Sequence, residues 1–243
     1  MGGSDNHPVD REAGDAWIAI QPEIVTIAKQ SRRFLIRAVH HLAAEAGVRQ
    51  FLDVGAGLPF TTGQNTHEVA RAASPDSRIA YVDNDPRVLA HGRAQLASTA
   101  AGVTAYIDAD YHDPDLIVSD AHNILDFTQP IAVMFMGVLG HVANYDEARA
   151  IVSRVFAATP SGSYLALWEN TDLTETARAA AAEYARTGAI PYRLCTPAQV
   201  TGFFEDLQLV EPGSVPLNRW RPGPVEVGAI EPLDAYAAVG RKT

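Results

Sequence analysis

The sequence of 243 residues contains a single cysteine, Cys195. One thiol cannot form a disulfide within the chain, which suits a reducing compartment. The sequence also has no apolar run of membrane-spanning length and no apolar leader at its start. These absences predict a cytoplasmic protein that does not associate with a membrane.

Runs of Lys and Arg are absent as well. The chain has 19 Lys and Arg against 29 Asp and Glu, a formal net charge of -10. Binding to nucleic acid or to an anionic membrane surface depends on basic patches, so both are disfavoured. A small-molecule substrate, or a basic one, fits this charge better. A homodimer is a further candidate assembly.

A glycine-rich turn follows the first predicted strand. Gln50 to Val54 has the branched, apolar character of a buried strand, and Asp53 is its only charge. Gly55, Ala56 and Gly57 follow at once. Small residues at such a turn let the backbone approach a ligand that larger side chains would exclude. The sequence therefore predicts that Asp53 and the three small residues contact a cofactor.

A second predicted strand, Ser77 to Val82, ends in the polar run Asp83, Asn84, Asp85. An acid at the tip of the strand that follows a glycine-rich turn is how nucleotide-binding α/β folds bind the two ribose hydroxyls. The pattern therefore indicates an adenosine-type cofactor held by Asp83, with Asn84 beside the adenine. The alternative is an ordinary structural turn between a strand and a helix.

The details of the turn separate the adenosine cofactors. A dinucleotide site needs a third glycine three positions after Gly57, where this chain has Phe60 preceded by Pro59. A pyrophosphate also needs a helix directly after the turn, whereas the stretch from Leu58 to Asn65 delays it. An NAD-linked oxidoreductase is thus disfavoured, and no Walker loop is present. S-adenosylmethionine, which has no phosphate, is the predicted cofactor.

A third strand, Val103 to Ile107, is followed by more acids. Asp110 is the candidate acceptor for the adenine amino group, with Tyr111 as the aromatic neighbour that covers the ring. The alternative is that Asp108 and Asp110 are both solvated loop residues.

Candidates for the substrate side follow the fourth and fifth predicted strands. Ile131 to Met136 leads into Gly137, a further cofactor contact, and then His141, which could act as a general base. Glu169 ends the fifth strand, followed by Asn170. Further candidates lie at the next helix start and on a late Pro- and Gly-rich loop: His67 and Trp220. No second His follows His67 at helical spacing, so no metal site is predicted.

Five successive strand-helix units predict a Rossmann-like, doubly wound α/β fold with a mostly parallel, seven-stranded sheet. Leu207 to Val210 and Ala235 to Gly240 lack a crossover helix between them, so they should form a C-terminal antiparallel hairpin. Residues 1–49 read as a helical cover over the open end of the sheet. Residues 50–243 read as the cofactor-binding domain, in one structural unit with the cover.

A parallel sheet with a final antiparallel hairpin, and with acids after three successive strands, is similar to the class I S-adenosylmethionine-dependent methyltransferases. Several segments more closely resemble an actinobacterial family of S-adenosyl methyltransferases that was long catalogued as a domain of unknown function. These segments are GGSDNHPVDRE, FLDVGAGLPFTTGQNTHEVA, YVDNDPRVLAHGRA, ADYHDP, FFEDLQLVEPGSVPLNRWRPG and YAAVGRK. They span nearly the whole chain, so the resemblance implies both the fold and the cofactor.

The resemblance also implies roles for particular residues. Asp53, Gly55 and Gly57 match the motif around the methionine part of the cofactor, Asp83 matches the ribose acid, and Asp110 matches the adenine position.

Other positions complete this set. Arg32 falls where the family tends to carry an arginine, which makes it a candidate partner for the methionine carboxylate. From composition alone, Gly2, Gly3, Asp5, Asn6 and His7 are candidates for a lid that touches the ligand, and the alternative is a frayed N-terminus. The predicted function is methyl transfer to an unidentified, small-molecule acceptor. The alternative is a catalytically silent protein that binds S-adenosylmethionine and acts as a regulator or partner subunit.

Overall fold

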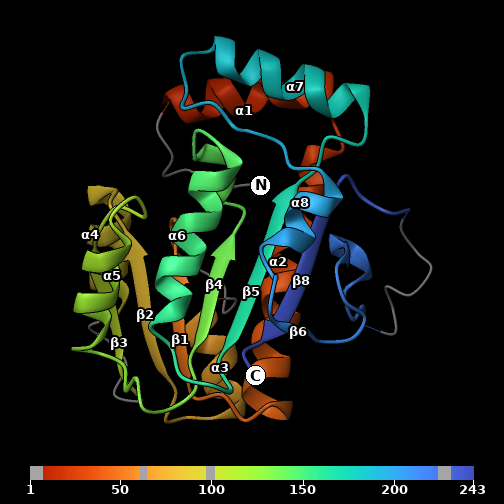
Figure 1. Cartoon of the computed structure of the whole chain (residues 1–243). Coiled ribbons are helices and arrows are strands. Elements are labelled where there is room, and N and C mark those ends of the chain that lie inside the picture. Colours follow the sequence, from red (N-terminus) through yellow and green to blue (C-terminus); the bar gives the residue numbers. More distant parts are fainter. Residues whose placement is uncertain (1–7, 61–64, 97–101, 224–230) are drawn as a thin grey trace.

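The computed structural model describes residues 8–60, 65–96, 102–223 and 231–243. Its centre is one eight-stranded sheet in the order β3-β2-β1-β4-β5-β8-β6, with β7 pairing with β8 beside this path (Figure 1). The strands are β1 (Gln50–Val54), β2 (Arg78–Asp83), β3 (Thr104–Asp108), β4 (Ala132–Met136), β5 (Tyr164–Asn170), β6 (Gln208–Leu209), β7 (Val215–Pro216) and β8 (Ala235–Arg241).

Strands β1 to β5 are parallel, and β8 pairs antiparallel with β5, β6 and β7. The predicted mostly parallel sheet with antiparallel C-terminal strands is thus confirmed, with the two-residue strand β7 as an unpredicted addition. The chain leaves β1 in one direction towards β2 and β3, and later in the other towards β4 and β5. The order reverses between β1 and β4, which is where open α/β sheets bind ligands at the carboxyl ends of the strands.

Helices cover both faces of the sheet, as the doubly wound prediction requires. One face carries α2 (Ile24–His40), α3 (Thr66–Ala73) and α4 (Pro86–Leu96), and the other carries α5 (Pro114–Ala121), α6 (Tyr145–Ala157) and α8 (Pro197–Gly202). Successive strand residues point to opposite faces, so Phe51 packs towards α2 and Leu52 packs on the other side. All five residues of β1 are buried, because both faces are covered.

The apolar stripe predicted from Ile24 to Ala46 forms one continuous helical segment. It buries Ile27, Phe34 and Leu35 against the sheet. The last turn, η1 (His41–Glu45), is π-helical. Gly47 ends the segment with a φ of 74°, the left-handed conformation that favours glycine.

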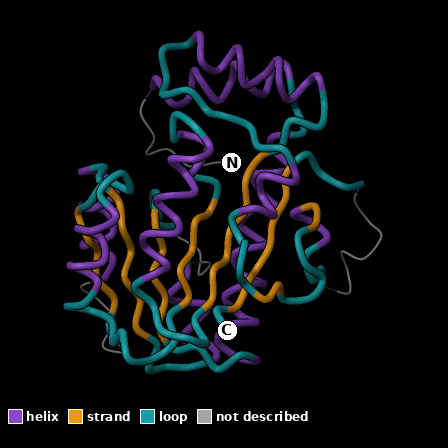
Figure 2. Tube along the Cα trace, in the orientation of Figure 1, coloured by secondary structure: helices purple, strands orange, loops and turns teal. Residues whose placement is uncertain are grey.

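Two helices from distant parts of the sequence, α1 (Pro8–Ile20) and α7 (Glu175–Arg186), pack together beyond the carboxyl ends of β4 and β5, at the top of Figures 1 and 2. The Trp17 ring of α1 contacts the rings of Tyr184 and Tyr192, with centroids 5.3 and 5.8 Å apart. Of the segment predicted as a cover, α1 takes that position, whereas α2 lies in the helical layer on the sheet. Among the described residues, no helix is long and apolar enough to cross a membrane.

Candidate active site

The glycine-rich turn at the tip of β1 has the backbone conformation that its sequence predicts. Gly55 and Gly57 have φ values of 71° and 65°, and the amides of Gly55 and Ala56 donate to the Val82 carbonyl at 2.9 and 3.1 Å. A Cβ on Gly55 would lie 2.6 Å from Cγ2 of Val138, whereas a Cβ on Gly57 would meet no atom of the described residues within 4 Å. The turn is therefore packed on one side and open on the other.

We expect Gly55→Ala to lower the free energy of unfolding by about 2–5 kcal/mol: about 1–2 kcal/mol from backbone strain and about 1–3 kcal/mol from overlap of the methyl group with Val138. Urea denaturation measures the loss. Adding Val138→Ala should recover the steric part and leave the backbone strain. No recovery in the double variant would show that Val138 does not limit the space at the turn.

Asp53 is buried beside this turn, on the face of the sheet that carries α2 and α3. Its Oδ2 accepts a hydrogen bond of 2.7 Å from Thr66 Oγ1 at the start of α3. Burial raises the pKa of Asp53 to about 6, although the Thr66 hydrogen bond and the Arg32 charge oppose this. The Arg32 guanidinium lies 3.4 Å above the Phe60 ring centroid. Arg32 thus comes from α2 to the same corner of the site as Asp53.

Asp83 connects the tips of β1 and β2. Its Oδ2 accepts from the Gly57 amide at 2.9 Å, and its Oδ1 accepts from the Asp85 amide at 3.0 Å. The side chain is partly exposed, and each of its oxygens keeps a further lone pair after these bonds. The predicted acid and the predicted turn are therefore in direct contact.

The polar residues after β2 and β3 also meet. Asn84 Nδ2 donates to Asp110 Oδ2 at 2.9 Å, and the His112 amide donates to Asp110 Oδ1 at 2.9 Å. The Tyr111 ring packs against His112, with centroids 4.5 Å apart. Asn84, Asp110 and Tyr111 thus form one group at the carboxyl edge, next to Asp83.

At the tip of β4, Gly137 lets the chain pass close to the neighbouring strand. Its φ is 76°, and a Cβ there would lie 2.3 Å from Cζ2 of Trp168. The following short helix η2 (Leu139–His141) is held by Glu169 from β5. Glu169 accepts from the amides of Leu139 and Gly140 at 2.8 and 3.2 Å, and from the Tyr192 hydroxyl at 2.6 Å.

Glu169 is completely buried, and burial raises its pKa to about 7 despite these donors. It lies below the surface at the carboxyl edge and holds the segment that follows β4. The structure gives Glu169 supporting contacts rather than an exposed carboxylate, and its place on the substrate side stays a prediction.

The two candidate histidines are both partly buried. His67 interacts through its backbone amide and Nδ1 with the Tyr81 hydroxyl, at 3.0 and 2.9 Å. The His141 ring packs edge-on against Tyr192, with centroids 5.0 Å apart. Burial lowers the pKa of both imidazoles. His141 therefore lies beneath the cover formed by α1 and α7, and His67 is tied to β2.

Trp220 is not part of this site. Its ring is fully buried and packs against Phe34 of α2 and His41, with centroids 5.4 and 6.0 Å apart. The loop that carries it folds over the helical face of the sheet, where a large apolar ring gains more by burial than at the open edge. The prediction for Trp220 is wrong for this reason. Asp5 and Asn6 lie outside the described residues.

Four residues of the site were not predicted from the sequence. Thr66 bonds Asp53, Val138 limits the space at Gly55, Tyr192 bonds Glu169, and Trp17 packs on Tyr192. Only Thr66 carried a signal, as a hydroxyl at the start of the helix after the turn. The other three act through contacts between segments that are distant in the sequence.

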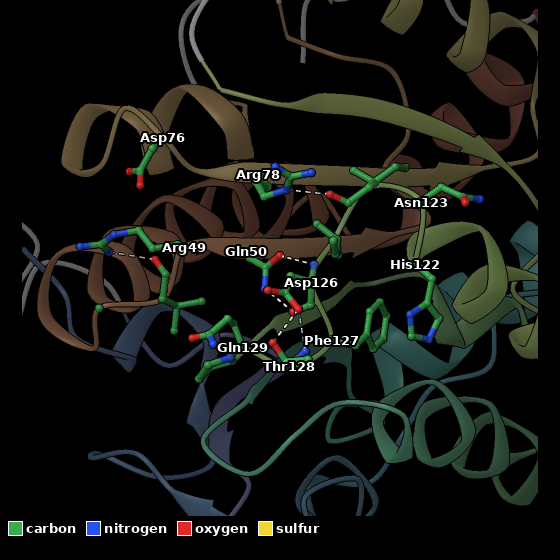
Figure 3. Close-up of a pocket in the computed structure, with 15 residues that line it drawn as sticks. Arg49, Gln50, Asp76, Arg78, His122, Asn123, Asp126, Phe127, Thr128 and Gln129 are labelled. Carbon is green, nitrogen blue, oxygen red and sulfur yellow. Dashed lines mark hydrogen bonds between the residues drawn. The ribbon is translucent and has the colours of Figure 1, made fainter.

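A cavity of about 940 Å³ opens at the opposite, amino edge of the sheet (Figure 3). Its polar groups bond to one another: Gln50 and the Asp126 backbone exchange hydrogen bonds of 2.8 and 2.6 Å, and Arg78 Nε donates to the Ile124 carbonyl at 2.7 Å. Parallel α/β sheets bind ligands at the carboxyl edge. We therefore assign this cavity a structural role.

Comparison with known proteins agrees with this geometry. Residues 1–243 match the family described as S-adenosyl methyltransferase. No curated protein matches the chain. A crystal structure of a DUF574 family protein from Streptomyces avermitilis is 41% identical, with a TM-score of 0.93, covering 100% of this chain and 94% of that chain. A protein from Thermobifida fusca that is considered a methyltransferase is 36% identical, with a TM-score of 0.90, covering 100% and 91%.

A more distant structure shares the fold. The N-methyltransferase NodS from Bradyrhizobium japonicum, in complex with S-adenosylhomocysteine, is 16% identical with a TM-score of 0.51, covering 98% of this chain and 89% of NodS. Because the family match spans the whole chain and the 41% identity to the Streptomyces structure covers 100% of this chain, this protein belongs to the S-adenosyl methyltransferase family.

Proposed function

We propose that the protein transfers a methyl group from S-adenosylmethionine to a small-molecule acceptor, and that the acceptor enters beside the tips of β4 and β5. The observation that carries this proposal is the hydrogen bond between Asp83 and the Gly57 amide, because it brings a ribose-binding acid to an open glycine turn. The absence of basic runs in the sequence supports a small acceptor over a nucleic acid.

The residues present fit the cofactor of this family. The open space at Gly57 allows close approach of the methionine part, which Arg32 and Asp53 would complement with opposite charges. Asp83 would accept from the ribose hydroxyls. Beside it, Asn84 and Asp110 bond to each other, and their remaining amide and carboxylate groups could form hydrogen bonds with an adenine ring.

When bound, S-adenosylmethionine supplies a methyl group that its sulfonium already activates. The protein then has to hold the acceptor atom in line with the methyl carbon and to exclude water. Helices α1 and α7 cover this side of the sheet. His141 lies beneath them, and burial keeps it neutral by lowering its pKa. It could take a proton from an acceptor that is a weak nucleophile.

We expect Gly57→Ala to weaken calorimetric binding of S-adenosylhomocysteine by about tenfold, because the added methyl group occupies the open side of the turn. The matched control is Gly47→Ala, since Gly47 also has a positive φ and open space but lies at the amino edge. Both variants should lose a similar, small amount of stability from backbone strain. Equal affinity of the two variants for the ligand would contradict the proposed site.

A further inference from the structure

Among the described residues, one buried amide oxygen at the carboxyl edge has no hydrogen-bond partner. Asn170, the last residue of β5, is 8% exposed, and its Oδ1 is buried and unpartnered. Burying an amide oxygen without a donor costs free energy, so a native protein seldom keeps one without a use. Rotating the amide by 180° would put the NH₂ group in the same unpartnered position.

The surroundings of Asn170 are otherwise well paired. Its carbonyl accepts from the Cys195 amide at 3.0 Å. The preceding Glu169 accepts three hydrogen bonds, and the hydroxyls of Thr171 and Thr174 both donate to Asp234. The β5 tip is therefore held firmly while one of its side chains stays free to bond something else.

Other described residues with an unpaired buried nitrogen differ from Asn170. Arg71 and Arg193 are each anchored by another nitrogen of the same guanidinium, to Thr104 and Cys195. The Trp220 indole nitrogen also lacks a partner, but it lies in the core under α2. His141 Nδ1, after β4, is the other unpartnered atom at the carboxyl edge among the described residues, and it belongs to an imidazole rather than an amide. Asn170 combines an unpaired amide with a position at the carboxyl edge.

The position of Asn170 places it beside the cofactor turn rather than in it. Side chains alternate along a strand, so Asn170 points to the same face as Trp168, towards α2. β5 is two strands away from β1, or about 10 Å. Trp168, Met136 and Ile24 make this neighbourhood apolar and aromatic. A second molecule that receives the methyl group would lie in this direction.

We infer that Asn170 binds the methyl acceptor, and that the acceptor is a largely apolar or aromatic small molecule whose O–H or N–H donates to the Asn170 oxygen. This inference rests on the proposed function. The donor of the acceptor molecule would supply the hydrogen bond that Asn170 Oδ1 lacks among the described residues. The apolar surroundings of Trp168 then bury the rest of the acceptor.

A stability comparison tests whether the amide is really unpaired. Asn170→Leu should leave Tm unchanged or raise it by about 2–4 °C, because it removes a buried polar group that lacks a partner. The matched control is Asn218→Leu: Asn218 is also buried, but its amide donates to the Glu231 carbonyl and accepts from the Leu233 amide. This control should lower Tm. Similar losses in both variants would overturn the inference.

A binding comparison tests the ligand class. In the complex with S-adenosylhomocysteine, followed by NMR titration, phenol should bind about tenfold more tightly than toluene or anisole, which lack a donor. Asn170→Ala should remove this preference, whereas Ala at the exposed Asn123 should keep it. Absent phenol binding, equal binding of the three probes, or a preference that survives Asn170→Ala would each overturn the inference. Failure of S-adenosylhomocysteine itself to bind would instead contradict the proposed function.

Discussion

Asp83→Ala is expected to weaken the binding of S-adenosylhomocysteine by about 1–3 kcal/mol, or roughly 5- to 150-fold, in a calorimetric titration. The variant removes the carboxylate that we assign to the ribose hydroxyls. It also leaves the amides of Gly57 and Asp85 without their acceptor, which loosens the turn that faces the cofactor. Both effects act on the same ligand, so the loss should be among the largest of any single substitution at this edge.

The neighbouring strand offers a matched control for this experiment. Asp108 pairs with Asp83 in the register of β2 and β3 and is exposed. Asp108→Ala removes the same charge at nearly the same place, and we expect little change in affinity. Equal losses would point to a general electrostatic effect. Unchanged affinity of Asp83→Ala would remove Asp83 from the site.

Glu169 should make the stability of the protein depend on pH. Its pKa is about 7 in the folded protein against 4.5 for an unperturbed glutamate, and the main cause is burial. Folding therefore favours the protonated form of Glu169. The stability of the protein has its full value below pH 4.5, where the carboxyl is protonated in both states, and it falls as the pH rises through 7. We expect the ionisation of Glu169 to lower the free energy of unfolding by about 3 kcal/mol between these two pKa values.

Urea denaturation at a series of pH values from about 4 to about 8 measures the effect. Glu169→Gln keeps an acceptor for the Leu139 amide but cannot ionise, so its stability should vary less with pH than that of the wild type. The control is Glu175→Gln, because the Glu175 side chain is 86% exposed. If the stability of Glu169→Gln varied with pH as much as that of the wild type, Glu169 would not titrate in this range.

Glu169→Leu should be the least stable variant at every pH, since three donors lose their acceptor.

Much of the carboxyl edge could be predicted because its residues are local to their strands. Gly55 and Gly57 follow β1 directly, and Asp83 and Asp110 follow β2 and β3. Parallel strands bring their carboxyl ends to one edge, so the sequence order alone implies that these residues meet. The antiparallel pairing of β6 with β8 could also be predicted, because the sequence indicates no crossover helix between them.

Contacts between distant segments could not be predicted in this way. The pairing of α1 with α7 depends on Trp17 meeting Tyr184, and neither residue carries a sign of its partner. The loop around Trp220 has the composition of a surface segment, yet its ring completes the core against Phe34. The role of Glu169 as a buried acceptor likewise depends on Tyr192, which arrives from a later loop.

The place of β8 in the sheet has a consequence for how the protein is made. This strand is synthesised after all the others but lies between β5 and β6, with β7 also bonded to it. While residues 235–241 are still inside the ribosome, the long edge of β5 has no neighbour and can pair with the wrong chain. The sheet can therefore be completed only after residues 235–241 have been synthesised and have left the ribosome.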